Sequence, residues 1–223
     1  MAIEEIILKI AIACAAPIIW LSLFLLEDRK KPEPKGMLVE VFVAGVAIAI
    51  FFATGLYLLL REFLPELIQH RSAVSIFLTA FGEEIFKFSA VYLVIRRSRF
   101  FDEPVDAMIY MITGAMGFAA MENILLVFSA PDPLNLMVFR FFGAVLLHAH
   151  AGGIIGFYWA KKQLGKGIFI ATAVHSVFNI LMVYFENGIL LGTWLLIVVT
   201  FFILRNFDII KHDQWNTNTR FKK

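Results

Sequence analysis

The segment Phe81-Gly82-Glu83-Glu84-Ile85-Phe86-Lys87 constrains the fold more than any other part of the chain. It lies in the middle of the run 73–95, which is otherwise apolar and long enough to cross a lipid bilayer as a helix. Three charges near the bilayer centre cost about 7–10 kcal/mol on insertion scales, whereas the apolar residues of the run return only about 4–7 kcal/mol. Such a helix needs partners that accept its charges, and we expect the rest of the chain to supply them.

Apolar runs of this kind recur along the whole chain, which has 223 residues, is 60% hydrophobic and is only 17% charged. About 20 apolar residues match the hydrocarbon thickness of a bilayer. We therefore expect an all-α fold, a polytopic transmembrane helical bundle that forms a single domain over residues 1–204, with a polar, basic tail over 205–223. Seven spans are predicted at residues 3–26, 38–60, 73–95, 105–128, 136–160, 168–185 and 189–204.

The basic residues between these spans favour one orientation in the membrane. Fifteen of them fall in the loops after the odd-numbered spans and in the tail, and only Lys9, Arg61 and Arg71 fall on the opposite side. Positively charged loops stay in the cytoplasm, so we predict a multi-pass cell-membrane protein with its N-terminus outside and its C-terminus in the cytoplasm. Glu4 and Glu5 stand where a signal peptide would carry basic residues, so the first span is predicted to be retained.

Few polar side chains lie inside the spans, and they come from four of them. They are Glu83, Glu84 and Lys87 in the third span, Glu122 and Asn123 in the fourth, Arg140, His148 and His150 in the fifth, and His175 and Asn179 in the sixth. A rise of about 1.5 Å per residue puts the third-span glutamates, His148 and His175 near the mid-plane. We therefore expect one polar cluster inside the bundle.

Helical spacing predicts the pairs within this cluster. Lys87 lies one turn from both third-span glutamates and can neutralise either of them. Those two glutamates are about 100° apart on their helix, so different roles are expected for them. Glu122 and Arg140 are shallower and could form an ion pair. His148 and His150 point to nearly opposite sides, so only one of them can face the cluster easily.

Two carboxylates and two imidazoles at one depth suit the activation of a water molecule. A desolvated carboxylate can act as a general base, and a histidine can orient the water or stabilise an oxyanion; Asn179 and Arg140 could also bind an oxyanion. A metal is the alternative, and His148, His175 and Glu122 would be its ligands. Because the chain lacks an H-E-x-x-H motif, Zn²⁺ has no support from a short motif, and a metal-free mechanism is equally open.

Five ordered motifs resemble those of the PrsW family of intramembrane proteases, which is related to the CAAX prenyl endopeptidases and to bacteriocin-processing membrane proteases. They are E-E-x-x-K at 83–87, F-D-E-P-V-D at 101–106 followed by Tyr110, G-F-A-x-x-E-N at 117–123, Arg140 with His148, and H-x-x-x-N at 175–179. Ala107 stands where the family pattern has glycine, outside the polar cluster.

The resemblance implies hydrolysis of a peptide bond inside or at the edge of the membrane. It implies that Glu83, Glu84, His148 and His175 carry the chemistry, with Glu122 and Asn179 close by and with Lys87, Asn123 and Arg140 in support. Enzymes of this kind are described both as metalloproteases and as metal-free, glutamate-dependent proteases, so Zn²⁺ stays open as a cofactor. The expected partners are a single-pass membrane protein as substrate and the lipid bilayer, with no nucleic acid.

Other classes of function fit the same polar residues. Intramembrane Glu, His and Lys also mark proton relays, so a proton- or ion-coupled transporter is one alternative. No internal repeat and no obviously broken span is visible in the sequence, which argues against it. A prenyl-protein endopeptidase of the CAAX type and a noncatalytic membrane scaffold are the others. The sequence does not determine the substrate, the oligomeric state or the metal.

Overall fold

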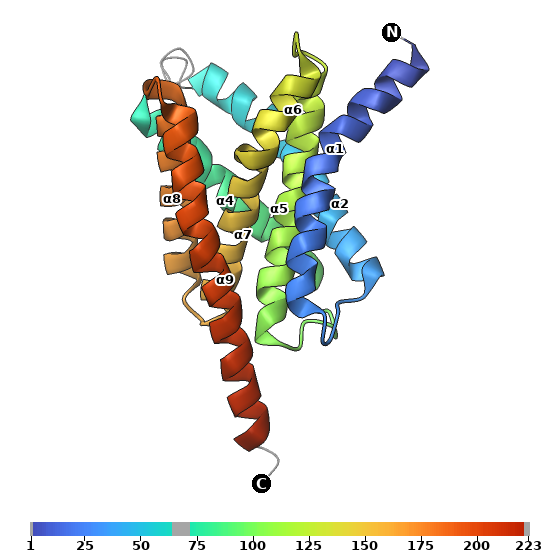
Figure 1. Cartoon of the computed structure of the whole chain (residues 1–223), viewed down its shortest axis with the longest axis vertical. Coiled ribbons are helices and arrows are strands. Elements are labelled where there is room, and N and C mark those ends of the chain that lie inside the picture. Colours follow the sequence, from blue (N-terminus) through green and yellow to red (C-terminus); the bar gives the residue numbers. More distant parts are fainter. Residues whose placement is uncertain (1, 64–71, 221–223) are drawn as a thin grey trace.

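The computed structural model describes residues 2–63 and 72–220, and in that part all regular structure is helical, as predicted. Arg71 and the last three residues lie outside the described residues. The elements are α1 (Ile3–Leu25), the 3₁₀ turn η1 (Leu26–Asp28), α2 (Lys35–Phe63), α4 (Ala73–Ile95), α5 (Pro104–Val127), α6 (Pro133–Phe142), α7 (Ala144–Ala160), α8 (Leu164–Tyr184) and α9 (Gly188–Arg220) (Figure 1).

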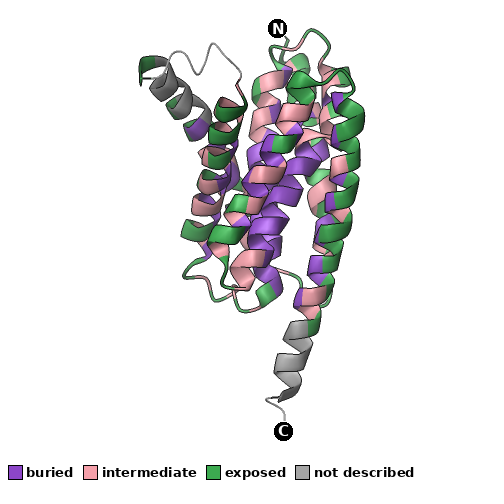
Figure 2. Ribbon diagram, turned by 90° about the vertical axis from the view of Figure 1, so that its left-hand side faces the viewer, coloured by how far each residue is buried: buried purple, intermediate pink, exposed green. Residues whose placement is uncertain are grey.

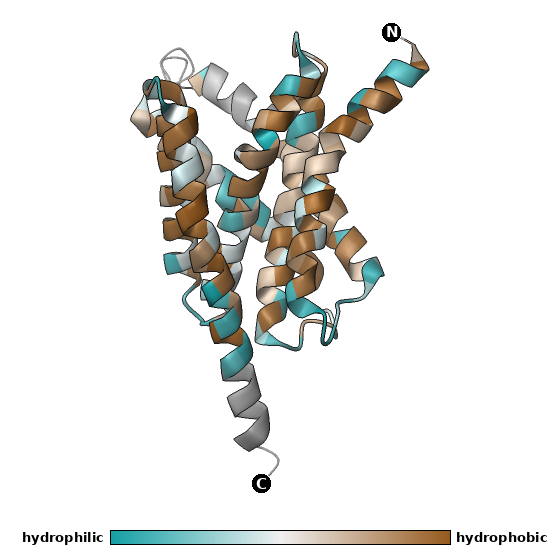
Figure 3. Cartoon of the chain, in the orientation of Figure 1, coloured by the Kyte–Doolittle hydropathy of each residue, from teal (hydrophilic) through white to brown (hydrophobic). Residues whose placement is uncertain are grey.

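The helices form a multi-pass membrane bundle. Within the described residues, six helical stretches are long and apolar enough to cross a bilayer, and α6 with α7 counts as one of them. The 23-residue α4 matches them in length but carries the three charges of the third predicted span. Figure 3 shows hydrophobic residues along much of most helices and a hydrophilic stretch of α4 in the middle of the bundle. The seven-span bundle is thereby confirmed, whereas the side on which each terminus lies stays a prediction.

The centre of the bundle is α5, which is buried along most of its length (Figure 2). It packs against α1, α2 and α7, and α8 and α9 pack outside α7. Small residues permit the closest of these contacts, as in other membrane helices. A Cβ atom on Gly117 of α5 would lie 2.0 Å from the carbonyl oxygen of Phe42 on α2, and one on Gly45 would lie 2.0 Å from that of Gly114. Helix α2 therefore lies in close contact with α5 at these glycines.

The fifth span differs from the prediction, because it is not one continuous helix. It breaks at Gly143, where α6 ends and α7 begins. The chain turns tightly here, and a Cβ atom on residue 143 would lie 2.9 Å from the carbonyl oxygen of Phe139. The break leaves carbonyl groups without helical donors, and the indole Nε1 of Trp20 on α1 donates to the Phe141 carbonyl over 2.8 Å. Neighbouring helices commonly satisfy such groups in membranes. The prediction that no span is broken was wrong.

The seventh helix is longer than predicted, since α9 continues past residue 204 as far as Arg220. Phe207 and Ile210 are buried in this extension. Phe207 stacks on Phe24 of α1, and Lys211 bonds to Glu27 just after α1. These contacts explain the continued helix, because burial of an apolar face stabilises a helix beyond its own propensity.

Candidate active site

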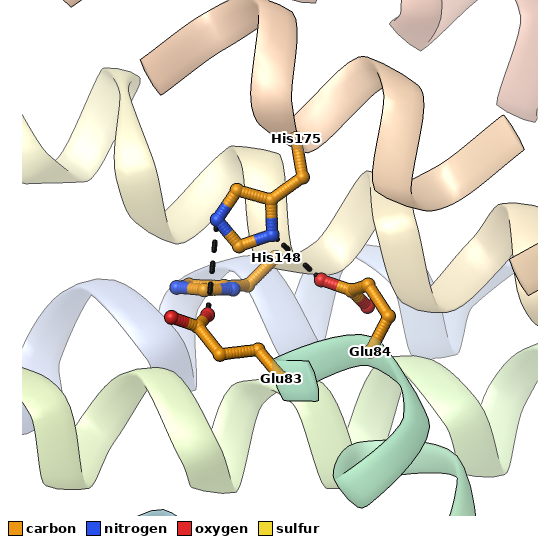
Figure 4. A group of neighbouring side chains, drawn as sticks. All are labelled: Glu83, Glu84, His148 and His175. Carbon is orange, nitrogen blue, oxygen red and sulfur yellow. Dashed lines mark hydrogen bonds and ion pairs between the residues drawn. The ribbon is translucent and has the colours of Figure 1, made fainter. Parts of the chain in front are cut away.

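Side chains from α4, α5, α6, α7 and α8 meet in one buried network. The third-span motif of α4 faces α7 and α8 there, and α5 and α6 close the network on the other side of His148. Figure 4 shows His175 and His148 from α8 and α7 lying over the two glutamates of α4. The rings of the two histidines are 5.2 Å apart and nearly perpendicular. The sequence-predicted site residues other than Asn179 are therefore brought together from distant parts of the chain.

Glu84 is the most deeply held carboxylate of the network. Its side chain and that of Lys87 are fully buried, and Lys87 Nζ donates to Glu84 Oε1 over 2.6 Å. The predicted neutralisation of one glutamate is confirmed, and Glu84 is the partner. The same ammonium lies 2.9 Å from His148 Nδ1 and 4.9 Å from the centre of the Phe118 ring. A buried charge needs such partners, because leaving it alone in an apolar interior is very costly.

His175 connects the two glutamates of α4. Its Nδ1 lies 2.7 Å from Glu84 Oε1, so Nδ1 carries the hydrogen and donates to this carboxylate. The Nε2 atom then faces the other glutamate, and its distance to Glu83 Oε2 is 3.7 Å (Figure 4). That distance is too long for a direct hydrogen bond. Glu83 Oε2 is buried and accepts no hydrogen bond in the described part of the chain. Glu83 and Glu84 thus have different surroundings, as their spacing predicted.

His148 joins the glutamates of α4 to the charged pair on α5 and α6. Its Nε2 lies 3.0 Å from Glu122 Oε2, and because Nδ1 accepts from the Lys87 ammonium, Nε2 is the donor. Arg140 pairs with the same Glu122 oxygen over 2.7 Å, which confirms the predicted ion pair. Asn123 accepts from Arg140 and donates to the carbonyl of Ala13 over 2.9 Å. This chain of bonds fixes His148 and ties α1, α5 and α6 to the site.

Three further residues, Asn179, His150 and Phe118, complete the description. Asn179 lies one helical turn beyond His175 on α8 and is half-buried, and no hydrogen bond found in the described residues ties it to the network. His150 is buried away from the site, and its Nε2 contacts the Thr200 hydroxyl of α9 over 3.1 Å. Phe118 was not predicted, although its place four residues before Glu122 puts it on the same face of α5.

The donor atoms of this network also suit a metal ion. Glu83, Glu84, His148 and His175 each offer one ligand atom, and these atoms lie within 4.8 Å of one another. The Oε2 atoms of both glutamates are buried and accept no hydrogen bond in the part of the chain that the structure describes. Carboxylate and imidazole donors are the ligands of catalytic Zn²⁺. This distance-defined set has the two glutamates of α4 in place of Glu122, whose bonds go to Arg140 and His148.

A buried cluster of glutamates and histidines, inside a helical bundle that spans a membrane, fits a polytopic membrane hydrolase. The comparisons with known proteins agree with this class. The chain belongs to the family described as PrsW family intramembrane metalloprotease, whose model matches residues 33–205. It is thus a multi-pass membrane peptidase, and the resemblance found in the motifs is confirmed.

The curated relatives are bacterial proteins named Protease PrsW. The one from Geobacillus kaustophilus is 27% identical, and the match covers 79% of this chain and 80% of the relative. The one from Oceanobacillus iheyensis is 26% identical over 83% of this chain and 88% of its own length, and the one from Bacillus subtilis is 26% identical over 81% and 85%. No solved structure matches the chain.

Proposed function

We propose that this peptidase cleaves single-pass membrane proteins within or near the bilayer, and that Glu83 and His175 activate the attacking water. The observation that carries the proposal is that Glu83 Oε2, which is buried without a hydrogen bond in the described residues, lies 3.7 Å from Nε2 of the buried His175. A water molecule beside them could donate a hydrogen bond to either atom, which is what a general base requires. The roles of the individual residues follow from their contacts.

Glu84 is the orienting group of this mechanism. By accepting the Nδ1 hydrogen of His175, it fixes the tautomer in which Nε2 is free. A buried carboxylate holds the catalytic histidine of a serine protease in the same way. Lys87 holds Glu84 in turn by donating to the same oxygen, Oε1.

The reaction then needs one group that accepts a proton and one group that donates a hydrogen bond to the oxyanion. Glu83 takes a proton from water as the oxygen attacks the scissile carbonyl carbon, and the carbonyl oxygen becomes the oxyanion. The amide of Asn179, one turn beyond His175, is the proposed donor to that oxyanion. Glu83 then returns its proton to the leaving amine as the C–N bond breaks.

The family description names a metal, and the residues present fit one. Glu83, Glu84 and His175 would hold it, and His148 would join them if it gave up its bond to Lys87. When bound, such a metal supplies a water molecule of lowered pKa and polarises the scissile carbonyl. The metal-free mechanism stays the proposal for the chain's own residues, and chelation tests it. Activity that is lost in chelator and restored only by Zn²⁺ or another metal ion would refute it.

The break at Gly143 deserves comparison with the transporter alternative, because discontinuous helices also line transporter sites. Membership of a peptidase family decides between them in favour of proteolysis. A flux in proteoliposomes that is lost on changing Glu83 would reopen the alternative.

The test compares peptide fragments in membranes of cells that express the wild type, Glu84→Gln, His175→Ala or Glu83→Gln. We expect single-pass proteins to lose their outer domains only with the wild type. Two histidines of α7 provide a matched control, since both are buried and only one lies in the network. His148→Gln should abolish the fragments and His150→Gln should preserve them at equal protein abundance. The same fragments from wild type and from all three active-site variants would refute the proposal.

A further inference from the structure

A second group of buried carboxylates lies at the end of the bundle away from the proposed active site. It consists of Asp28 in η1, Glu33 just before α2, and Asp106 in the first turn of α5. Figure 1 shows the end of α1 and the starts of α2 and α5 together at the lower end of the molecule. One oxygen atom from each carboxylate lies within 4.8 Å of the other two. Asp106 precedes Glu122 by sixteen residues on α5, or roughly 24 Å, so the two clusters are separate.

The hydrogen bonds of this group leave one carboxylate oxygen, Asp28 Oδ2, without a donor in the described residues. Asp106 Oδ2 accepts the backbone N–H groups of Asp102 and Glu103 over 2.9 and 2.7 Å, as a capping box. Glu33 accepts the hydroxyl of Tyr110. Asp28 keeps only 6% of its surface exposed, and its Oδ2 is buried without a hydrogen bond in the described residues. That orphaned oxygen belongs to a carboxylate that directly adjoins the other two.

Two lysines of this end of the bundle, Lys31 and Lys211, bind other carboxylates. Lys31 pairs with Asp102 and Glu103 over 2.7 and 3.1 Å. Lys211 pairs with Glu27. Carboxylates crowded into a buried position repel one another, and none of these three forms an ion pair within the described residues, so a positive charge from outside the chain would stabilise this arrangement.

We infer that Asp28, Glu33 and Asp106 form a binding site for a hard divalent cation, namely Mg²⁺, Ca²⁺ or Mn²⁺. The donor set is made of oxygen atoms alone, which these ions prefer, and it lacks the nitrogen and sulfur donors typical of Zn²⁺. The three ligands come from the end of α1, the segment before α2 and the start of α5. A bound ion therefore fastens α1 and α2 to the central helix α5, far from the reacting groups.

The test measures Mn²⁺ binding by electron paramagnetic resonance on the full chain in detergent or nanodiscs. Wild type should bind the ion saturably. Asp28→Asn should weaken binding at least ~10-fold, because changing even a residue that only supports a metal ligand costs about that much affinity. Asp102→Asn is the matched control, because its side chain is 54% exposed and pairs with Lys31 outside the group. It should bind as the wild type does. Competition by Mg²⁺ and by Ca²⁺ shows which ion the site prefers.

Two further variants keep the result decisive. A protein with both Glu83→Gln and His175→Ala should retain the Mn²⁺ signal of this site, which separates it from any metal in the active site. Glu33→Gln repeats the ligand test if Asp28→Asn does not fold. The inference is overturned if wild type shows no saturable binding. It is also overturned if the bound ion is lost in the active-site double variant and unaffected by Asp28→Asn and Glu33→Gln.

Discussion

The buried pair of Lys87 and Glu84 should be the most sensitive electrostatic contact in the molecule. Both side chains are fully buried and their charged atoms are 2.6 Å apart. At an effective dielectric constant of about 20, this distance gives a gross attraction of about 6 kcal/mol. Desolvation offsets much of it, but removing one partner leaves the other buried and unpaired, which costs about 3–5 kcal/mol. Lys87→Met should therefore lower the midpoint of thermal unfolding by roughly 6–20 °C for a chain of this size.

The chain offers a matched control for this prediction. Lys31 and Asp102 form the same kind of pair at 2.7 Å, but their side chains are 55% and 54% exposed. Exposed pairs contribute about 0–1 kcal/mol, so Lys31→Met should hardly change stability. Thermal unfolding of the purified proteins, in one detergent and at one pH, measures both effects.

A double variant separates the pair from a general loss of packing. Lys87→Met combined with Glu84→Gln leaves no unpaired charge, so it should be more stable than Lys87→Met alone, with a coupling of about 2 kcal/mol or more. It should still be inactive, because the group that orients His175 is lost. If Lys87→Met is no less stable than Lys31→Met, or if the double variant loses as much as the two single variants combined, the reasoning is refuted.

Two further predictions concern packing and the second buried histidine of α7. Gly117→Ala should destabilise the protein by about 1–3 kcal/mol or more, since its Cβ would meet the Phe42 carbonyl at 2.0 Å, whereas Gly165→Ala, with open space around it, should not; thermal unfolding of the two variants compares them. Thr200→Val removes the hydrogen-bond partner of buried His150 and should lower the free energy of unfolding by about 1–3 kcal/mol, with the turnover of substrate unchanged. If the variant loses turnover at normal stability, His150 belongs to the catalytic network.

Much of the site could be predicted because a charge inside a membrane span demands a partner. The two glutamates of the third span, His148 and His175 were predicted to lie at one depth near the mid-plane, which indicated a single cluster. The i,i+3 and i,i+4 spacings indicated that Lys87 binds one of the two glutamates. Spacing alone could not choose between those glutamates, because both lie one turn away. In the folded chain Lys87 bonds to both His148 and Glu84, and the position of His148 on α7 could not be known from the spacing within α4.

The features that sequence reasoning missed depend on contacts between distant segments. One glycine in an apolar run gives no sign of a break, and Gly143 ends a helix only because the chain turns there and Trp20 satisfies a freed carbonyl. The group of Asp28, Glu33 and Asp106 brings together residues up to 78 positions apart. The fourth span was predicted to begin at residue 105, and α5 begins at Pro104 with a capping box, but nothing in the sequence predicted the carboxylates that meet there.

The charges of the active-site network explain why Glu83 is the reactive group. Within the network as the structure describes it, Glu84 is paired with Lys87 and Glu122 with Arg140. Glu83 is the remaining carboxylate, and the one possible ion-pair partner found within 4 Å of it there is the imidazole of His175. With neutral imidazoles, the network holds one negative charge more than it has cations. That charge is left at the one carboxylate oxygen that faces a free ring nitrogen, where it can be balanced by a proton taken from water or by a metal ion. The pairing that lets α4 reside in the membrane thus leaves Glu83 as the group that can do chemistry.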